Sequence, residues 1–286
     1  MTIQWFPGHM AKARRQVEER LKIIDIVFEL LDARIPSASQ NPMMDEIVGH
    51  KPRIILLNKY DLSDPAVTKE WVSFFERKGG HALPIDSLSG RGLETIPKLA
   101  ESLTQSVQDK RQAKGMKGRA IRAMIVGIPN VGKSSLINRL AKRSVAQTGD
   151  RPGVTKSQQW IKTGKNLDLL DTPGILWPKF GEERVGYLLA ATGAIRDEIL
   201  DIYDVALFTL KIMKERYEKR LVERYGLEEG VSDPLQILEE IGRKRGILRR
   251  GGEVDMERSA DLFLKELRNG KLGPISLESP GDAAEF

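Results

Sequence analysis

The stretch GIPNVGKSS, residues 127–135, follows an apolar run and opens a helical pattern. It fits G-x-x-x-x-G-K-[ST], and a strand before this motif with a helix after it is the context of a phosphate-binding loop. Its glycines let backbone N–H groups close around phosphate oxygens, and the helix N-terminus adds the positive end of its dipole. The alternative is a glycine-rich turn with an exposed lysine. The predicted phosphate-binding residues are Asn130, Val131, Gly132, Lys133, Ser134 and Ser135.

Two of these residues and a second motif predict a site for a nucleotide with Mg²⁺. Lys133 would span the β- and γ-phosphates and contribute to catalysis, while Ser134 would bind Mg²⁺. DTPG, residues 171–174, ends another expected strand. Asp171 can hold Mg²⁺ through water, and the Gly174 N–H can sense the γ-phosphate. Alone this tetrapeptide is an ordinary turn, but beside a phosphate loop it predicts a switch.

The stretch NKYD, residues 58–61, has the composition of a guanine-reading loop. Guanine carries a ring N–H beside an exocyclic amine, and one carboxylate can accept from both. Asp61 suits that contact, Asn58 can bridge loops or touch the ring edge, and the Lys59 stem can pack on the base. A helix N-cap at Asp61 is the alternative. DSLSG, residues 86–90, is the weaker partner signal, with the Ser87 or Leu88 backbone N–H as donor to the guanine carbonyl.

The rest of the first 179 residues alternates between apolar runs and helical patterns, which predicts an α/β fold with a parallel sheet covered on both faces. The runs expected as strands are Ile23–Arg34, Pro52–Asp61, His81–Gly90 and Ile121–Gly127, followed by a strand pair around residues 156–174. The expected helices are Pro42–Val48, Ala66–Lys78, Gly92–Val107 and the stretch after Gly132. The chain order therefore places the guanine-reading motif before the phosphate loop.

Composition changes along the chain predict its division into parts. We expect an N-terminal segment over residues 1–20 and a polar, basic linker over about 108–119, within residues 107–120. After residue 179 the chain reads as helices, so a smaller all-helical domain is expected over 180–286, with a frayed tail at 273–286. Residues 1–179 hold 29 basic and 18 acidic residues (+11), and residues 180–286 hold 17 and 22 (−5). The basic first part favours a polyanionic partner, although solubility and phosphate binding also explain it.

Several classes of protein are disfavoured by composition. The chain has no cysteine, which excludes disulfides and Cys-based metal sites, and only three histidines, which disfavours zinc. No apolar run approaches the ~20 residues of a membrane span. The N-terminus lacks the apolar core of a signal peptide. We therefore expect a cytoplasmic protein without a membrane partner.

The motif order NKYD, DSLSG, GIPNVGKSS, PGVT, DTPG resembles that of circularly permuted GTPases, with NKxD before the Walker A loop. More narrowly, the chain is similar to the ribosome biogenesis GTPase A family of the YlqF type. WFPGHM (5–10), DARIP (32–36) and RPGVTKSQQW (151–160) carry that match, which covers most of residues 1–180. The resemblance implies a P-loop GTPase domain that binds GTP and GDP. It also implies assembly of the large ribosomal subunit, with rRNA and ribosomal proteins of a precursor particle as partners.

Circular permutation is physically reasonable, because the termini of a domain commonly lie close together and joining them moves no motif in space. The segment after DTPG then runs directly into the helical part. A loop that responds to the γ-phosphate can thereby bias the pose of that part.

The residues that would complete hydrolysis are less certain from sequence. Thr155 of PGVT is the switch threonine expected to contact Mg²⁺ and the γ-phosphate, with Thr148 as the weaker choice. Ile175 stands where many GTPases carry a water-orienting glutamine, as in the family resembled, so turnover alone should be slow. Help could come from K⁺, because Asn130 resembles the asparagine of potassium-activated GTPases; the alternative for Asn130 is hydrogen bonding within its loop. It could also come from His9 as a water-positioning imidazole, which otherwise has a structural or RNA-contacting role.

The partner is the least determined feature. GRKRGILRRGG, residues 242–252, packs five basic residues between glycines and could bind rRNA phosphates, or be a solvated charged face. Asp32 and Arg34 either tie the N-terminal segment to the site or form a local ion pair. We expect a monomeric GTPase that the large ribosomal subunit stimulates, with potassium as a further candidate activator. A signalling-type GTPase switch without an RNA partner is the alternative.

Overall fold

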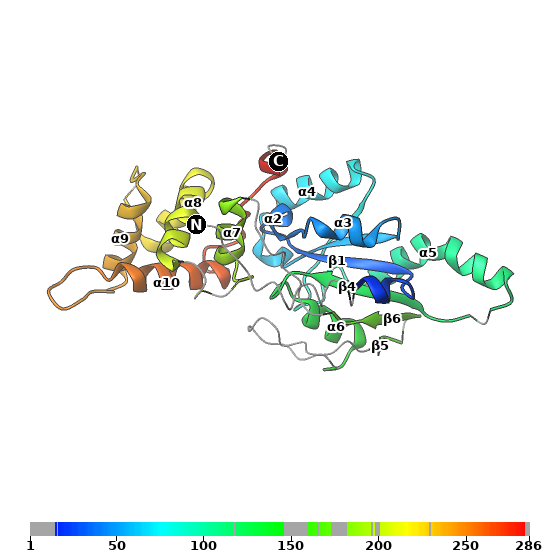
Figure 1. The fold of residues 1–286 in the computed structure, drawn as a ribbon. Helices are drawn as coiled ribbons and strands as arrows, with labels where there is room; N and C mark the ends of the chain where they lie inside the picture. The colour runs from blue at the N-terminus through cyan, green and yellow to red at the C-terminus, as the bar shows by residue number, and fades with distance from the viewer. Residues whose placement is uncertain are drawn as a thin grey trace.

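The computed structural model describes residues 15, 17–116, 118–145, 160–164, 166–172, 182–195, 197, 201–228 and 230–283. These residues form an α/β part around one sheet and a helical part beside it (Figure 1). The sheet has six strands in the order β3-β2-β1-β4-β6-β5. Its strands are β1 (Ile26–Asp32), β2 (Arg53–Asn58), β3 (His81–Pro84), β4 (Ile121–Gly127), β5 (Trp160–Lys162) and β6 (Leu167–Leu170).

The sheet is parallel except at one edge, where β5 pairs antiparallel with β6. The side chains of β1, IVFELLD, are all buried. A strand buried on both faces reads as a continuous apolar run, which is why the sequence pattern located it. The α/β class and the six-strand arrangement agree with the expectation from sequence, with the antiparallel edge as an addition.

The register of the central strands brings the motifs to one edge. Asp32 at the end of β1 pairs with Asn58 at the end of β2, and Leu30 pairs with Gly127 at the end of β4. On the other side of β4, Met124 pairs with Leu170, the residue before Asp171. Binding sites of open α/β sheets form outside the carboxyl ends of the strands. The guanine-reading and phosphate-loop motifs therefore meet despite their reversed order in the chain.

Short and long helices connect the strands. They are α2 (Pro36–Ser39), α3 (Met43–Val48), the 3-10 turn η1 (Tyr60–Leu62), α4 (Pro65–Arg77), α5 (Ile96–Ala113) and α6 (Lys133–Ala141). A small apolar cluster around Trp71 and Phe75 packs α4 on β1–β3, and the remaining core extends through the sheet and the other helices.

Helix α5 corrects the predicted linker over 108–119, because it runs six residues into that range and ends at Ala113. Gln105 donates to Asp109 one turn on, and Lys110 and Arg111 lie in the last turn, where cations are favourable. Gly115 with φ +68° follows the helix end. Polar and basic residues are typical of linkers, but here they form the exposed face of a helix.

The helical part consists of α7 (Glu183–Ala191), α8 (Ile202–Tyr225), α9 (Pro234–Lys244) and α10 (Met256–Arg268). Asp201, Asp233 and Asp255 cap the last three by accepting backbone N–H bonds. Apolar side chains on α8, α9 and α10 pack together, with Leu210 and Phe263 fully buried. This confirms the predicted helical C-terminal part. Of the helices described, none combines the length and apolarity that a membrane span requires.

Residues 273–283, the described part of the tail, do not fray as predicted. Residues 274–279, here called the C-terminal strap, return to the α/β part, and α11 (Pro280–Ala283) lies beside α4 (Figure 1). Ile275 donates its N–H to the Leu62 carbonyl and Leu277 donates to the Arg34 carbonyl, both at 2.8–2.9 Å. The Trp71 indole donates to the Glu278 carbonyl at 3.3 Å. The strap is ordered because its apolar side chains are buried and its backbone groups are paired.

Candidate functional site

Asn58 joins three loops at the carboxyl edge of the sheet. Its side chain is buried, its Oδ1 accepts from the Ser87 backbone N–H at 3.0 Å, and its Nδ2 donates to the Val131 carbonyl at 2.7 Å. One amide therefore holds the NKYD loop, the 86–90 loop and the phosphate loop together. Of the two roles predicted for Asn58, bridging loops is the one the structure displays.

A cavity of about 820 Å³ lies between these loops and the helical part. From the α/β part it is lined by Arg34, Asn58, Lys59, Asp61, Leu62, Asp86, Ser87, Leu88, Asn130, Gly132 and Ser135. From the helical part it is lined by Thr192, Gly193, Ile195, Asp197, Lys265, Arg268 and Asn269. The carboxylate at Asp61 and the loop before Lys133 thus share one cavity, although they are far apart in sequence.

The phosphate loop has the backbone that its sequence predicts. Gly132 has φ +104° and ends the loop where α6 begins, and Asn130 adopts φ +56°. A Cβ on Gly132 would lie 2.3 Å from the Asn58 Nδ2, and a Cβ on Gly127 would lie 2.6 Å from the Leu30 carbonyl. Only glycine fits at either position, because backbone and side chain approach too closely for any other residue.

Lys133 lies inside this loop. Its Nζ donates to the carbonyls of Gly127 at 3.0 Å and Ile128 at 2.7 Å. Burial lowers its pKa to about 8, and the charge of Asp171 opposes that shift. The lysine is held at the N-terminus of α6, where the helix dipole favours an anion. The loop can therefore offer a phosphate both the ammonium group and backbone N–H groups.

Asp171 and Ser134 form the candidate metal position. Asp171 is 2% exposed, and its Oδ1 has no hydrogen-bond partner among the residues that the structure describes. Burial raises its pKa, and Lys133 lowers it. Ser134 lies in the first turn of α6. Oxygen ligands of this kind suit Mg²⁺, which keeps waters and takes few protein ligands.

The described chain holds no group of three or more His, Cys, Asp or Glu side chains that could bind a metal by itself. Phosphate oxygens would therefore supply the remaining ligands, so the residues present fit a nucleotide-bound Mg²⁺.

Asp61 faces the cavity from η1, and the alternative that it caps a helix is wrong. Asp64 is the residue that caps α4, accepting from the Ala66 N–H at 2.9 Å. Burial raises the pKa of Asp61, Asp86 adds to the shift, and Arg34 opposes it. Lys59 precedes it with φ +61°, and its Nζ lies 3.1 Å from Asp32.

The donors predicted for the guanine carbonyl are already engaged. The Ser87 N–H donates to Asn58, and the Leu88 N–H donates to the Asp86 carboxylate at 2.8 Å. The Leu88 side chain is 75% exposed at the cavity rim. A base oxygen would have to share one of these N–H groups, so the assignment of Ser87 and Leu88 stays a prediction.

Other predicted residues lie outside the described ranges. These are His9 within residues 5–10, Thr148, Thr155, Gly174 and Ile175. Asn130 is described, and its Nδ2 donates to the Gly193 carbonyl at 2.9 Å. This contact between the phosphate loop and the helical part was not expected from sequence, and no local pattern could have indicated it, because it joins residues 63 positions apart.

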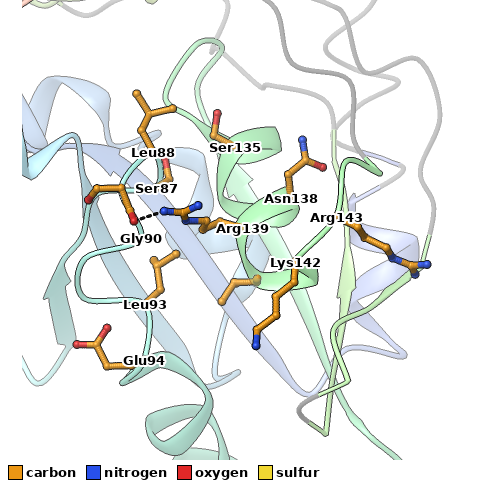
Figure 2. Close-up of a pocket in the computed structure, with 12 residues that line it drawn as sticks. Ser87, Leu88, Gly90, Leu93, Glu94, Ser135, Asn138, Arg139, Lys142 and Arg143 are labelled. Atoms are coloured by element: carbon orange, nitrogen blue, oxygen red, sulfur yellow. Dashed lines mark hydrogen bonds between the residues drawn. The ribbon is translucent and has the colours of Figure 1, made fainter.

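A second groove of about 760 Å³ lies beside the first cavity, between the 87–94 loop and α6 (Figure 2). Arg139 crosses it and donates to the Ser89 carbonyl, while Lys142 and Arg143 lie past the end of α6 (Figure 2). Ser87, Leu88 and Ser135 line both spaces. The groove is thus a lateral extension of the same loop cluster.

Comparison with known proteins decides the family. The chain is 54% identical over 285 residues to "Ribosome biogenesis GTPase A" of Bacillus cereus, covering 100% of this chain and 96% of that protein. It is 56% identical to the protein of the same name from Priestia megaterium, covering 100% and 99% of the two chains. The chain belongs to the ribosome biogenesis GTPase A family. The Thermotoga maritima member is 34% identical, with 98% and 95% covered.

The family membership agrees with the fold. GDP-bound YlqF from T. maritima matches with a TM-score of 0.64 at 31% identity, covering 94% of this chain and 100% of that one. GNP-bound YlqF from T. maritima matches with a TM-score of 0.62 at 31% identity, covering 94% and 98%. Residues 122–239 match the family described as 50S ribosome-binding GTPase, a match that begins inside β4 just before the phosphate loop. The motif order is circularly permuted as in YlqF, with a helical part after the GTPase domain.

Proposed function

We propose that the protein hydrolyses GTP to GDP and phosphate and acts as a nucleotide-dependent assembly factor of the large ribosomal subunit. The observation that carries the GTPase activity is the Asn58 amide, which binds the 86–90 loop and the phosphate loop and so places Asp61 and Gly132 on one cavity. The role in assembly rests on the ribosome biogenesis names of the relatives.

In this proposal the guanine is read by the NKYD loop with Ser87 and Leu88. Asp61 accepts from the ring N–H and exocyclic amine, Lys59 packs its stem on the base, and Asn58 holds the loops in place. An adenine offers no such pair of donors, so the site selects GTP over ATP.

The phosphates are held by residues 130–135, with the Lys133 ammonium at the β- and γ-phosphates. Mg²⁺ would be held by Ser134 directly and by Asp171 through water, and it would neutralise charge developing on the phosphate oxygens. Thr155 would join the metal site and the Gly174 N–H would contact the γ-phosphate.

Hydrolysis without help is slow in this proposal, because Ile175 cannot orient water. His9, the large subunit, or K⁺ at Asn130 supplies the missing assistance. K⁺ would be bound through the Asn130 side-chain oxygen, because the amide nitrogen is a donor and cannot ligate a cation.

We infer that rRNA of a precursor particle contacts both parts of a monomeric protein, divided at about residue 179. In the 242–252 segment, Arg243 pairs with Glu239, Arg245 lies 3.7 Å from Glu266, and Arg249 pairs with Asp255. These pairs reduce the net charge of the segment, which projects from the end of the helical part farthest from the sheet (Figure 1). The 242–252 segment therefore contributes modestly to rRNA binding. The net charge of +11 on residues 1–179 supplies most of the electrostatic attraction to rRNA.

Turnover of GTP and ATP should be compared in K⁺ and in Na⁺, with and without purified large ribosomal subunits. We expect selective GTP turnover that rises when subunits are added and loses that gain at high salt. GTP turnover that subunits leave unchanged would favour the signalling-type switch instead.

A single substitution tests base recognition. Asp61→Asn should lower GTP affinity and shift preference toward xanthosine triphosphate, because the amide donates where the carboxylate accepted. Asp64→Asn is the matched control, since asparagine caps α4 equally well and residue 64 does not line the cavity. Unchanged guanine selectivity in the Asp61 variant would refute the assignment.

A further inference from the structure

Behind the NKYD loop, the buried Asp32 carboxylate lies between one buried cation, Arg34, and one half-buried cation, Lys59. The Asp32 carboxylate is 2% exposed and accepts from the Arg34 Nε at 2.9 Å and Nη2 at 2.7 Å. It also accepts from the Arg34 backbone N–H at 3.1 Å, and the Lys59 Nζ lies 3.1 Å away. Because Asp32 and Asn58 are register partners at the ends of β1 and β2, the strand pairing itself sets this arrangement.

The cluster has more positive charge than a local ion pair needs. Arg34 is 1% exposed, and its Nη1 has no hydrogen-bond partner among the described residues. Arg34 is fully and Lys59 partly removed from water. One carboxylate does not repay the desolvation of a buried cation and a half-buried one, so such a group adds little to stability alone. Its excess charge lies on the wall of the cavity that Asp61 also lines.

The same residues are enclosed by the helical part and by the C-terminal strap. The Arg34 Nη2 donates to the Thr192 carbonyl at 3.4 Å, and the Leu277 N–H donates to the Arg34 carbonyl at 2.9 Å. These contacts exclude water from the back of the cavity. A charge held there acts on the cavity with little screening.

We propose that Asp32 and Arg34 are positioning residues for guanine recognition, acting through Lys59 and Asp61; this rests on the proposed function of the cavity. Asp32 fixes the Lys59 ammonium, so the methylene stem forms a flat wall for the base and the left-handed Lys59 backbone keeps Asn58 and Asp61 in place. Arg34 locks the Asp32 carboxylate by its two-pronged contact. Its charge also opposes protonation of Asp61, whose pKa burial and Asp86 raise.

The chain contains a matched control pair of the same chemistry. At the opposite end of β1, Arg119 donates to both Asp25 carboxylate oxygens at 2.7 and 2.9 Å. Asp25 is buried like Asp32, but neither residue of this pair lines the nucleotide cavity. A role limited to folding predicts the same behaviour from the two pairs.

The test compares Asp32→Asn, Arg34→Lys and Asp25→Asn by calorimetric binding of GDP and inosine diphosphate, which lacks the exocyclic amine. We expect Asp32→Asn to weaken GDP binding at least about tenfold and to reduce the preference for GDP over inosine diphosphate. Arg34→Lys should lie between this variant and the wild type, because lysine keeps the charge but not the two-pronged contact. In turnover, KM should rise while kcat at saturating GTP changes little. Asp25→Asn should lower the melting temperature and leave both affinities unchanged.

A double-mutant cycle with Lys59→Met tests whether Asp32 acts through Lys59. We expect Asp32→Asn to add little to the loss already caused by Lys59→Met; full additivity overturns the proposal. Equal GDP affinity and selectivity in Asp32→Asn, Arg34→Lys and wild type also overturns it, and if Asp32→Asn does not fold, Arg34→Lys decides alone. A wild type that does not select guanine contradicts the proposed function itself, so the two failures are distinguishable.

Discussion

Replacing Asn58 by alanine removes both hydrogen bonds that hold the nucleotide loops together. The Ser87 N–H and the Val131 carbonyl lose their partner, and these residues are only 4% and 1% exposed. An unsatisfied buried group costs about 1–3 kcal/mol, so the two together cost about 2–6 kcal/mol. Because the nucleotide cavity adjoins Asn58 and admits water, we expect the lower half of that range.

The assay has two readouts. Urea unfolding should show a free energy of unfolding lower by about 2–4 kcal/mol, and the melting temperature should fall by about 4–16 °C. GDP affinity should fall as well, because the 86–90 loop and the phosphate loop are no longer held at a fixed distance. The control is Asn41→Ala, since Asn41 is also buried but its Oδ1 accepts from the Met43 N–H, away from the cavity.

Asn41→Ala should lower the free energy of unfolding by about 1 kcal/mol and keep full GDP affinity. The reasoning about Asn58 is refuted if Asn58→Ala unfolds within about 0.5 kcal/mol of the wild type and binds GDP equally well. In that case the three loops would be held by other contacts, and the convergence of the motifs would not depend on this amide.

Two further predictions concern the phosphate loop and the C-terminal strap. Gly132→Ala should lower GDP affinity at least about tenfold, because its Cβ would lie 2.3 Å from Asn58 Nδ2 and the backbone has φ +104°. The control Gly118→Ala should bind GDP normally, because the space around its Cβ is open. Calorimetry that shows equal GDP affinities for the two variants would contradict this. Burial raises the pKa of Glu278 to about 8 from 4.5, while the Ala38 N–H lowers it. Between these two pH values the folded state keeps a proton that the unfolded state loses. The contribution of Glu278 to the free energy of unfolding is therefore fully present below pH 4.5 and falls as the pH rises to about 8, by at most about 5 kcal/mol. Urea titrations across this window should show a larger fall in the wild type than in Glu278→Gln, where Glu29, whose pKa burial raises to about 7, still contributes a fall of its own. Equal pH slopes in the two proteins would rule out the role of Glu278.

Much of the site could be predicted because its signals are local. The limits of β4 match the predicted Ile121–Gly127. A continuous apolar run between polar residues indicates a buried strand once a phosphate loop follows it. Parallel pairing then places the carboxyl ends of β1, β2 and β4 at one edge of the sheet. The motifs at these ends therefore meet whatever their order in the chain. The α5 extension was missed because charged residues suit both a linker and the exposed face of a helix.

The contacts that close the cavity were beyond sequence reasoning. Arg34 reaches Thr192 and Asn130 reaches Gly193, in both cases through a backbone carbonyl. Every residue carries the same backbone carbonyl, whatever its side chain. The sequence therefore does not indicate which position accepts the hydrogen bond. Such contacts depend on how the helical part packs against the α/β part, and periodicity and turn signals do not encode that packing.

The C-terminal strap limits how a nucleotide could move the helical part. That part is attached to the GTPase domain by the chain after Asp171 and again by the strap, which bonds to Leu62 beside the base-reading loop and to Arg34 behind the cavity. Tyr217, where α8 departs from helical geometry, adds a third tie by donating to Asp64 at 3.2 Å and accepting from the Ser276 N–H at 3.0 Å. A full swing of the helical part would break these bonds, which are buried or half-buried, at about 1 kcal/mol each. We therefore expect the helical part to respond to the phosphate loop by a small rotation that keeps these bonds and shifts Gly193 relative to Asn130, rather than by separation.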